Sequence, residues 1–442
     1  MRPKPISWFF ENLPWLQLIE DRYKTSIKQN YALSGFIPLE TASIEREEIL
    51  TSKSGDNEIY GVHRLNPDSK DSALALRFDL TVPLARYVAQ HEWEIKFPFK
   101  RQQIQKVWRG ERPQKGRFRE FYQADVDIIG NGSLPLFADV EILFTTFSAL
   151  QKLELGDFVI NLNNKKLLTG YLHAIWIEEE KILETIAIID KKDKISREAL
   201  SELFGKAWVS LDIQKEVFKL LDVSEQSDFD TIYESFSGYE NELLSEGLSE
   251  IKYVYDSLIN LGLTTDNIRF NPTIARGLNY YTGTVYETFL TWYEQYGSMC
   301  SGGRYENLTS HFTKWSYPWV GGSIGLTRLL SIAISEWLIE EDKQSLTRVM
   351  VTNLDKQYLS EYLEIVRLLR DNDISTELFL DSSAKMKKQL KYANDKTVDL
   401  IVIIWEEEIN NGTISIKNLN TREQKEVKKD QLLEEVQKIL VY

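Results

Sequence analysis

The sequence predicts an α+β fold in which strand-rich segments flank a long helical stretch and precede a compact C-terminal α/β domain. Three patterns support this prediction: two-faced strands before residue 130, helical patterns alone over about 175–263, and alternating strands and helices after residue 345. With 442 residues, the chain has room for two or three domains at roughly 150 residues each.

The first predicted segment, residues 1–174, opens with a helix at Leu16–Gln29 and an extended stretch at Gly35–Ile44. Over Leu76–Val82, apolar and polar side chains alternate strictly, which is typical of a strand with one buried face. The polar face of this predicted strand carries three side chains, Arg77, Asp79 and Thr81.

Two further predicted strands, Val107–Glu111 and Phe121–Ile129, flank a loop of high positive charge. The cations of this region are Arg109, Arg112, Lys115, Arg117 and Arg119. The second strand has a mostly polar face made by Phe121, Gln123, Asp125 and Asp127. A hairpin with a solvated face would favour Lys and Glu. The pattern therefore predicts the floor of a site for a nucleotide and a small polar substrate.

Helical signals then dominate the chain. An amphipathic helix at Phe137–Leu153 and a short strand at Phe158–Leu162 close the first segment. Over 175–263 strand signals disappear, and stretches rich in Glu, Lys, Leu and Ile follow one another between serine-rich breaks. We interpret 175–263 as a helical insertion.

Strand and glycine signals return in the third predicted segment, residues 264–339. They run over Ile268–Gly325 and lead into a strongly apolar helix at Ile324–Leu338. This helix contains one arginine, Arg328. Such an arginine is usually either paired with a carboxylate or directed into a pocket, and the helix by itself leaves both possibilities open.

The last predicted segment, residues 345–442, follows a plausible linker at 340–346 and reads as a compact α/β domain. A continuous apolar strand at Leu400–Trp405 is of the kind that is buried in a parallel or mixed sheet. The other predicted strands are Arg348–Thr352, Ser375–Leu380 and Thr413–Ile416, and the predicted helices are Gln357–Asp371, Ala384–Asn394 and one from about Asp430.

Composition narrows the function classes. The net charge is −14, but nine lysines and arginines against two acids give Lys96–Glu120 a local charge of +7. Such a strip can bind RNA or serve ATP alone, and charge does not decide between them. No run of about 18 apolar residues predicts a membrane span. Cys300 is the single cysteine, which excludes an internal disulfide and favours a cytoplasmic location. The four histidines show no metal-ligand spacing.

Three further motifs carry glycine beside arginine or tyrosine. They are ARGLNYYTGTVYE at Ala275–Glu287, CSGGRYENL at Cys300–Leu308 and VGGSIGLTRLL at Val320–Leu330. Together with WRGERPQKGRFREFYQADVDIIG, they resemble the histidyl-tRNA synthetase family of class II aminoacyl-tRNA synthetases. The tryptophan-led stretch is similar to the family's motif 2, GGSIGLTRL to its motif 3, and the other two to its histidine-specific signatures. All four occur in the family's order, and the resemblance covers nearly the whole chain.

The resemblance implies an antiparallel sheet flanked by helices, a helical insertion between motifs 2 and 3, and a C-terminal α/β anticodon-binding domain. It implies ATP-dependent ligation of L-histidine to tRNA(His) through a histidyl-adenylate intermediate. It also implies a homodimer with motif 1 at the interface, here the N-terminal helix plus GFIPLETASIER. Mg²⁺ is expected with the phosphates, but its protein ligands cannot be read from the sequence.

Motif positions assign roles to particular residues. The resemblance implies that Arg109 holds the α-phosphate and that Arg117 and Arg328 hold the outer phosphates. Glu111 would approach the adenine, and Arg276 would lie across the α-phosphate and the substrate carboxylate. Arginine suits this task because its planar fork holds phosphate oxygens and keeps its charge. The resemblance also places the acceptor end of the tRNA at Arg112, Gln114 and Lys115.

Recognition of histidine requires acceptors. Asp79, Thr81 and Gln123 would receive the α-ammonium group, and Asp127 and Tyr281 would hold the two imidazole nitrogens. Two further tyrosines, Tyr280 and Tyr305, are expected in the same site, which Arg276 borders. In the C-terminal domain, Lys385, Lys387, Lys388 and Lys391 either meet the anticodon or form an ordinary solvated face.

The chain departs from the family pattern at two positions. Ala42 stands where motif 1 has a proline, and Asn279 replaces the acid of the RGL-acid-YY signature. An alternative class also remains: a non-catalytic synthetase-like regulatory subunit of ATP phosphoribosyltransferase, which lacks the anticodon-binding domain and erodes the ATP arginines. This chain keeps those arginines and has the extra domain, which favours the synthetase. A stand-alone RNA-binding or sensor module is a third possibility, weakened by the same features.

Overall fold

The structure is a computed structural model that describes residues 3–52, 58–65, 73–112, 116–192, 194–207, 209–223, 228–274, 281–306, 308–339 and 343–440. The chain forms two compact units. One comprises Met1–Glu11 and Tyr23–Ile339, and the other comprises Asn12–Arg22 and Glu340–Tyr442. In the described part of the chain, no helix is both long and apolar enough to cross a membrane.

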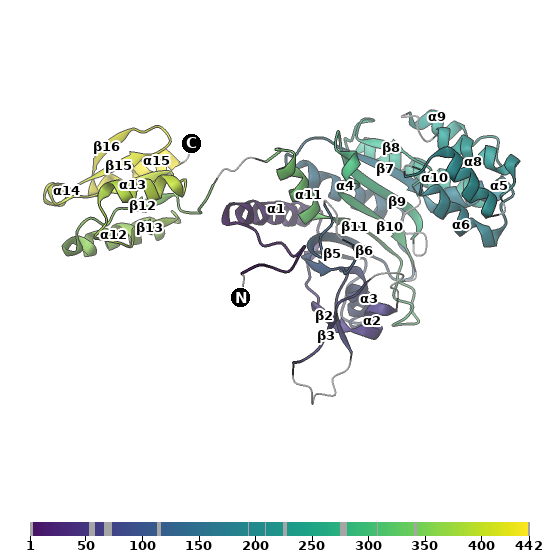
Figure 1. Cartoon of the computed structure of the whole chain (residues 1–442), viewed down its shortest axis with the longest axis horizontal. Coiled ribbons are helices and arrows are strands. Elements are labelled where there is room, and N and C mark those ends of the chain that lie inside the picture. Colours follow the sequence, from purple (N-terminus) through teal and green to yellow (C-terminus); the bar gives the residue numbers. More distant parts are fainter. Residues whose placement is uncertain are drawn as a thin grey trace. The chain divides into compact units, whose positions relative to one another are not determined.

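A mostly antiparallel sheet forms the centre of the first unit (Figure 1). Its strand order is β1-β5-β6-β11-β10-β9-β7-β8, and only the β1–β5 and β7–β8 pairs are parallel. This confirms the predicted antiparallel sheet. The strands are β1 Ile37–Pro38, β5 Phe99–Trp108, β6 Glu120–Ile129, β7 Phe158–Asn164, β8 Ile268–Phe270, β9 Tyr281–Leu290, β10 Cys300–Tyr305 and β11 Trp319–Ile324.

Helices flank this sheet, as predicted. The flanking helices are α4 Phe137–Gln151, α11 Leu326–Ser335 and the part of α1, Pro14–Leu33, that belongs to this unit from Tyr23 onward. Helix α4 packs on β6, β7, β10 and β11 and is buried along most of its length, which its largely apolar sequence favours. Tyr31 of α1 is fully buried, and its hydroxyl donates to the carbonyl of Ala124 on β6.

The strand predicted at Leu76–Val82 is wrong beyond its first residue. Strand β4 ends at Leu76, and helix α3 begins at Thr81 and runs over Thr81–Gln90. Asp79 explains the difference, because its Oδ1 accepts a hydrogen bond from the amide of Val82 and so satisfies a donor of the first helical turn. Strand β4, Leu74–Leu76, instead belongs to a small sheet with β2, Ile44–Arg46, and β3, Gly61–Val62, beside the short helix α2, Glu47–Thr51.

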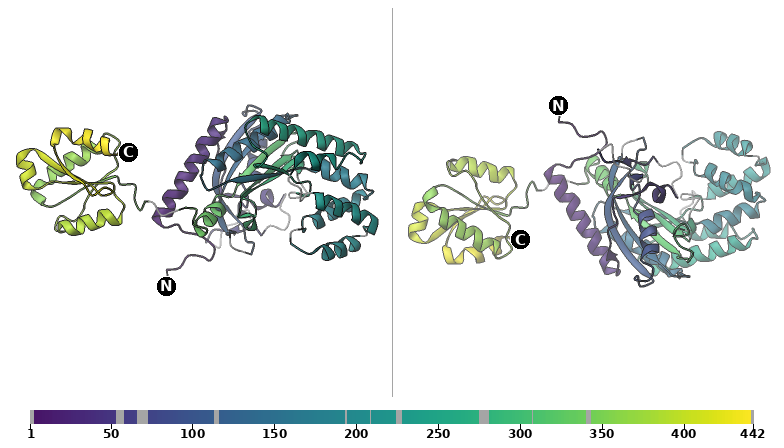
Figure 2. Two further views of the ribbon diagram at one scale, coloured as in Figure 1. Left: turned by 90° about the horizontal axis from the view of Figure 1, so that it is seen from above. Right: turned by 90° about the horizontal axis from the view of Figure 1, so that it is seen from below.

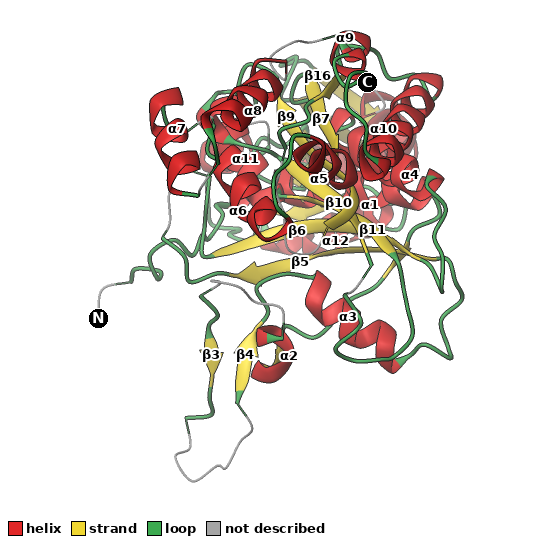
Figure 3. Cartoon of the chain, turned by 90° about the vertical axis from the view of Figure 1, so that its right-hand side faces the viewer, coloured by secondary structure: helices red, strands yellow, loops and turns green. Residues whose placement is uncertain are grey.

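Helices, joined by loops, occupy the described residues between β7 and β8; they lie beside one end of the sheet in Figure 1 and in front of it in the view of Figure 3. Two glycines let α5 and α10 approach closely. A Cβ on Gly170 would lie 2.2 Å from the amide nitrogen of Leu244, and one on Gly247 would lie 2.3 Å from that of Leu167. The helices are α5 Lys165–Ala174, α6 Glu179–Ile189, α7 Arg197–Lys206, α8 Leu211–Val223, α9 Phe229–Glu234 and α10 Glu242–Asn260.

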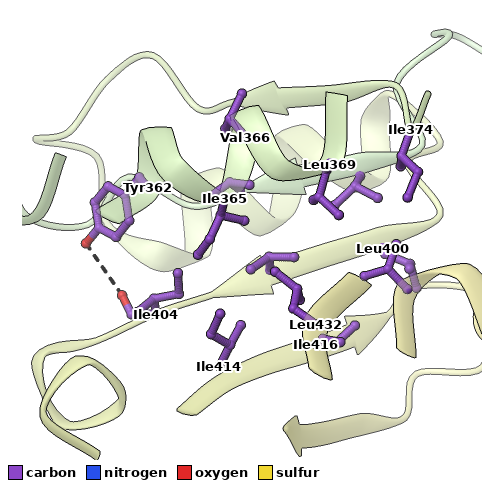
Figure 4. Packing of buried hydrophobic residues seen from close by; sticks show 14 of the residues in the cluster. Tyr362, Ile365, Val366, Leu369, Ile374, Leu400, Ile404, Ile414, Ile416 and Leu432 are labelled. Atoms are coloured by element: carbon purple, nitrogen blue, oxygen red, sulfur yellow. Dashed lines mark hydrogen bonds between the residues drawn. The ribbon is translucent and has the colours of Figure 1, made fainter. Parts of the chain in front are cut away.

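The second unit contains a mixed sheet of order β13-β12-β14-β15-β16, with β12 parallel to β13 and β14 and the remaining pairs antiparallel. Strand β14 is apolar throughout because both of its faces are buried. Leu400 and Val402 pack with the cluster around Tyr362 (Figure 4), and Ile401 and Ile403 pack on the other face. The strands are β12 Val349–Val351, β13 Thr376–Leu378, β14 Leu400–Ile403, β15 Thr413–Asn418 and β16 Gln424–Lys428.

Helices cover both faces of this second sheet (Figure 2). The helices are α12 Leu359–Arg370, α13 Met386–Asp395, α14 Glu406–Asn411 and α15 Leu432–Leu440. The sequence prediction missed α14 and β16. Helix α14 has only one turn and a half, and β16 is a polar edge strand, so neither carries a strong apolar period.

Tryptophan occupies an unusual backbone conformation in the first unit. Eight described residues other than glycine have positive φ, and four of them are tryptophans: Trp8, Trp176, Trp292 and Trp337. The last three have side chains that are 83–87% exposed. A bulky residue with positive φ is a rare outlier, because its Cβ crowds the neighbouring carbonyl.

Candidate active site

Two adjoining pockets open on one face of the central sheet. The first, with a volume of about 370 Å³, lies over β6 and beside α11, and the second, about 640 Å³, lies between β6, β10 and α3. Arg109, Ser301 and Ser323 line both pockets and so form a common wall. We call them the arginine pocket and the acidic pocket after their charged linings.

The arginine pocket gathers most of the residues that the sequence assigned to ATP. These are Arg109, Glu111, Arg117 and Arg328, together with Arg112 of the predicted acceptor-end set. Gln123 also lines this pocket rather than the acidic one, and its Nε2 donates to Ser323 Oγ at 2.8 Å.

Backbone carbonyls orient two of these arginines. Arg109 Nε donates to the carbonyl of Phe78 at 3.0 Å, and its guanidinium lies over the ring of Phe121. Arg328 Nε donates to the carbonyl of Gly116 at 3.0 Å, and its Nη1 donates to that of Ser298 at 2.9 Å. The arginine of the apolar helix is therefore directed into a pocket. Guanidinium groups fixed in this way present donors suited to phosphate oxygens.

The acidic pocket gathers residues assigned to histidine, namely Asp79, Thr81, Asp127, Tyr281 and Tyr305. Asp127 is buried, and its two carboxylate oxygens have different partners. Tyr305 Oη donates to Oδ1 at 2.9 Å, and Arg101 Nη2 lies 2.7 Å from Oδ2. The rings of Tyr281 and Tyr305 lie 6.1 Å apart.

Burial raises the pKa of each acid in this pocket. It raises the pKa of Asp79 to about 6, against opposing effects of the Val82 amide and the cations Arg109 and Arg101. Burial raises the pKa of Asp125 to about 7 and also raises that of Asp127, while Arg101 lowers both. A pocket with carboxylates that titrate near neutrality is typical of functional sites.

Glycine at two adjacent positions of β11 makes room on both faces of the sheet. A Cβ on Gly321 would lie 2.0 Å from Asp127 Oδ1. A Cβ on Gly322 would lie 2.0 Å from the hydroxyl of Tyr286, on the opposite face. Gly321 therefore allows Asp127 to lie flat against the sheet, and Gly322 makes the corresponding room for Tyr286.

The sequence prediction did not single out Arg101, Asp125 or Ser323. The prediction began β5 at Val107, whereas β5 begins at Phe99. With the correct start, the hairpin register places Arg101 directly opposite Asp127, which is the signal that could have found it. Asp125 was assigned to the polar face of β6 but received no role.

Some predicted residues lie outside the described part of the chain. These are Arg276, Tyr280, Gln114 and Lys115, with the departure at Asn279. Within the described ranges, no group of three or more histidine, cysteine, aspartate or glutamate side chains is arranged to hold a metal ion.

In the second unit, two of the four predicted lysines are engaged by nearby acids. Lys388 pairs with Asp381 at 3.2 Å and Lys391 with Asp395 at 2.7 Å, and all four side chains are largely exposed. Exposed pairs of this kind are held weakly, so they leave both the anticodon and the solvated-face interpretations open.

Comparison with known proteins identifies relatives over the whole length. The family model described as histidyl-tRNA synthetase matches residues 13–329, and that of an anticodon binding domain matches residues 348–439. The histidine–tRNA ligase of Clostridium tetani is 38% identical over 444 residues, covering 100% of this chain and 98% of the relative. That of Stenotrophomonas maltophilia is 38% identical over 456 residues, covering 99% of this chain and 98% of its own.

Solved structures are similar as well. The crystal structure of histidyl-tRNA synthetase from Nostoc has a TM-score of 0.91 at 34% identity and covers 99% of both chains. A Bacillus halodurans structure described as an ATP phosphoribosyltransferase regulatory subunit/histidyl-tRNA synthetase has a TM-score of 0.74 at 21% identity, covering 88% of this chain and 97% of its own. That second likeness concerns the fold alone.

Proposed function

Since the chain belongs to the histidyl-tRNA synthetase family, we propose that it ligates L-histidine to tRNA(His) through a histidyl-adenylate intermediate. The observation that carries this proposal is the common wall of the two pockets, because adenylate formation requires the histidine carboxylate to meet the α-phosphate of ATP. The reaction is an in-line displacement that needs little proton transfer. Positioning and charge stabilisation therefore supply most of the catalysis.

In the arginine pocket, Arg109 would hold the α-phosphate, and Arg117 and Arg328 the outer phosphates. Arg109 suits this role because it belongs to both pockets and thus reaches the point where the two substrates join. Arg276 would lie across the α-phosphate and the carboxylate. Glu111 is the one carboxylate among the described residues of this pocket, which fits a Mg²⁺ ion held mainly by phosphate oxygens.

In the acidic pocket, Asp79 and Thr81 would accept from the α-ammonium group of histidine, with Gln123 reaching from the arginine pocket, where it is hydrogen-bonded to Ser323 of the common wall. Asp127 and Tyr281 would bind the imidazole nitrogens, with Tyr280 and Tyr305 beside them. Such a site discriminates strongly, because an apolar amino acid would leave buried polar groups unpaired.

The second step transfers the histidyl group to the terminal hydroxyl of the tRNA. Arg112, with Gln114 and Lys115, would meet the acceptor end, and the domain matched at 348–439 would read unstacked anticodon bases. We also propose a homodimer in the cytoplasm, with the N-terminal helix and the stretch that contains Ala42 at the dimer interface.

The alternative role, a regulatory subunit without catalysis, is disfavoured by two observations. The chain includes a matched anticodon binding domain, and Arg109, Arg117 and Arg328 all line one pocket. A subunit that has lost catalysis has no need to keep three arginines directed at the same space.

Histidine-dependent exchange of pyrophosphate into ATP tests the proposed function. The purified chain should catalyse exchange with histidine and not with other amino acids, and Arg328→Ala should remove most of it. Arg197→Ala is the matched control, because Arg197 pairs with Asp222 on the exposed surface of the helical part. Absence of exchange in the unaltered chain would overturn the proposal in favour of a regulatory role.

A further inference from the structure

We propose that Arg101 is a positioning residue that fixes Asp127 for recognition of the substrate imidazole, an inference that rests on the proposed function. Arg101 does not line either pocket, yet it lies on β5 directly opposite Asp127 on β6. Its side chain is fully buried. Arg101 can therefore affect a bound ligand only indirectly, through its contact with Asp127.

The guanidinium of Arg101 lies between two carboxylates. Its Nη2 lies 2.7 Å from Asp127 Oδ2 and 4.0 Å from Asp125 Oδ2, while Nη1 donates to Gln103 Oε1 at 3.1 Å. With Tyr305 on the other oxygen, Asp127 is held at both ends. A carboxylate oxygen can accept two hydrogen bonds, so each still has capacity for a ligand N–H.

Removal of this cation would leave two buried carboxylates side by side. Because Arg101 lowers the pKa of both carboxyls, its removal would let at least one of them keep its proton to a higher pH than in the unaltered chain. A protonated Asp127 is a poorer acceptor for an imidazole N–H and is no longer held in one orientation. The other ionisable groups whose charges act on Asp127 or Asp125 are Tyr31, Arg77, Asp79, Tyr286, Cys300 and Tyr305, and Arg109, Lys165, Tyr281 and His311 line the acidic pocket with them.

The test is the pH dependence of the KM for histidine in Arg101→Met, measured by pyrophosphate exchange. We expect the KM to rise at least tenfold at neutral pH and to fall again as the pH is raised to about 9, where both carboxyls ionise. The KM for ATP should change little, and Arg101→Lys should restore most of the loss. A KM profile parallel to that of the unaltered chain would overturn the proposal.

A matched control separates positioning from general stability. Arg304→Met breaks a comparable buried pair, with Asp139, but leaves both pockets intact. It should lower the unfolding midpoint and leave the pH profile of the KM for histidine the same as in the unaltered chain. If Arg304→Met shows the same KM profile as Arg101→Met, the proposal fails. If the unaltered chain shows no exchange at all, the proposed function itself fails.

A second inference comes from an independent feature, the tryptophans with positive φ. We infer that positions 176, 292 and 337 are glycine in the protein as its source cell makes it. Tryptophan makes up 11 of 442 residues but four of the eight described non-glycine residues with positive φ. At positions 176, 292 and 337, packing does not explain why the bulkiest residue adopts the conformation that suits it least, because these three side chains are 83–87% exposed.

Hydrogen bonds at two of these positions define a helix ending that favours glycine. After α5, the amide of Trp176 donates to His173 and that of Ile177 to Leu172. Together these two bonds make a Schellman motif, in which the left-handed residue is usually glycine. The amides of Trp337 and Leu338 make the same two bonds at the end of α11, to Ile334 and Ala333.

The same chain supplies an internal comparison. Helix α10 ends with this pair of bonds around Gly262, at φ +99°. Elsewhere in the chain, a tryptophan ring makes a specific contact. Trp108 lies in a strand, and its Nε1 donates to Glu120 at 2.8 Å. A codon such as UGA, a stop signal that some translation tables read as tryptophan, would produce this pattern if the cell reads it as glycine.

Peptide mass spectrometry on protein isolated from the source cells tests this inference. Peptides that contain positions 176, 292 and 337 should have the masses calculated with glycine at those positions. The peptide that contains Trp108 should have the mass calculated with tryptophan. Tryptophan at all four positions would overturn the inference. In recombinant protein, the triple variant Trp176→Gly, Trp292→Gly and Trp337→Gly should have a higher unfolding midpoint than the chain with tryptophan at these three positions. A lower midpoint would contradict the structural basis of the inference.

Discussion

The central sheet carries two buried arginine–aspartate pairs on opposite faces. Arg101 and Asp127 meet on the face with the pockets, whereas Arg304 and Asp139 meet on the face covered by α4. Arg304 is fully engaged, because its Nε and Nη2 donate to Asp139 and its Nη1 and Nη2 donate to the carbonyls of Leu134 and Pro135.

The two pairs differ in what they leave available. The donors of Arg304 are used by one carboxylate and two carbonyls, so this residue fixes the start of α4 against β10. The carboxylate of Asp127 lines a pocket and keeps acceptor capacity. The same two residue types therefore stabilise the fold on one face and prepare a binding surface on the other. The number of satisfied donors and acceptors distinguishes the two uses.

The largest expected effect is on the structural pair. Arg304→Met leaves the carboxylate of Asp139 buried without its cation, and should lower the free energy of unfolding by about 3–5 kcal/mol. Urea denaturation measures this change. A loss below about 1 kcal/mol would show that the pair is not structural and would remove the contrast with Arg101.

A second effect concerns the space around Asp127. Gly321→Ala puts a methyl group where Asp127 Oδ1 lies, 2.0 Å from the new Cβ. The displaced carboxylate should reduce kcat/KM for histidine on the order of a hundredfold. Gly205→Ala in α7 is the control, since a Cβ there meets nothing within 4 Å. Equal activity in both variants would contradict the role given to Asp127.

The third effect is a pH dependence. Burial raises the pKa of Asp79 from 3.8 to about 6, so between these values the folded protein holds a proton that the unfolded chain has released. Stability should therefore decrease as the pH rises from about 4 to 6. Binding of the histidine ammonium group should improve over the same rise, because it needs the ionised carboxylate. Asp79→Asn should weaken the stability trend, to which Asp125 and Asp127 contribute with the same sign, and should remove the improvement in the KM for histidine.

The smallest expected effect is on an exposed ion pair, which contrasts with the two buried pairs. Lys391 and Asp395 form an exposed pair in the second unit. Lys391→Gln should change the free energy of unfolding by less than about 0.5 kcal/mol, because solvent and salt weaken such pairs. Affinity for tRNA measured across salt concentrations then decides between the two interpretations of this helix. An unchanged salt slope favours the solvated face, and a shallower slope favours an anticodon contact.

Much of the fold and of the candidate site could be predicted from local patterns. The alternation of β6 correctly placed Gln123 and Asp127 on a pocket face, and the apolar run at β14 correctly indicated a strand buried on both sides. Such features depend on residues close in sequence.

What was missed depends on residues far apart in sequence or on competing local rules. The role of Arg101 appears only when β5 is paired with β6 in the right register. The alternation at Leu76–Val82 imitated a strand, but the Asp79 side chain and the helix that begins at Thr81 overrode it. A period-two pattern over seven residues cannot exclude a strand end followed by a helix start.

The common wall of the two pockets has a kinetic consequence. A molecule that fills both, as the proposed adenylate would, is held at two ends whose binding groups share Arg109, Ser301 and Ser323. When one end detaches, the other keeps it at high effective concentration near the vacated pocket, so rebinding competes with escape. The intermediate should therefore dissociate more slowly than either substrate, which protects a reactive anhydride from loss to water while the tRNA arrives.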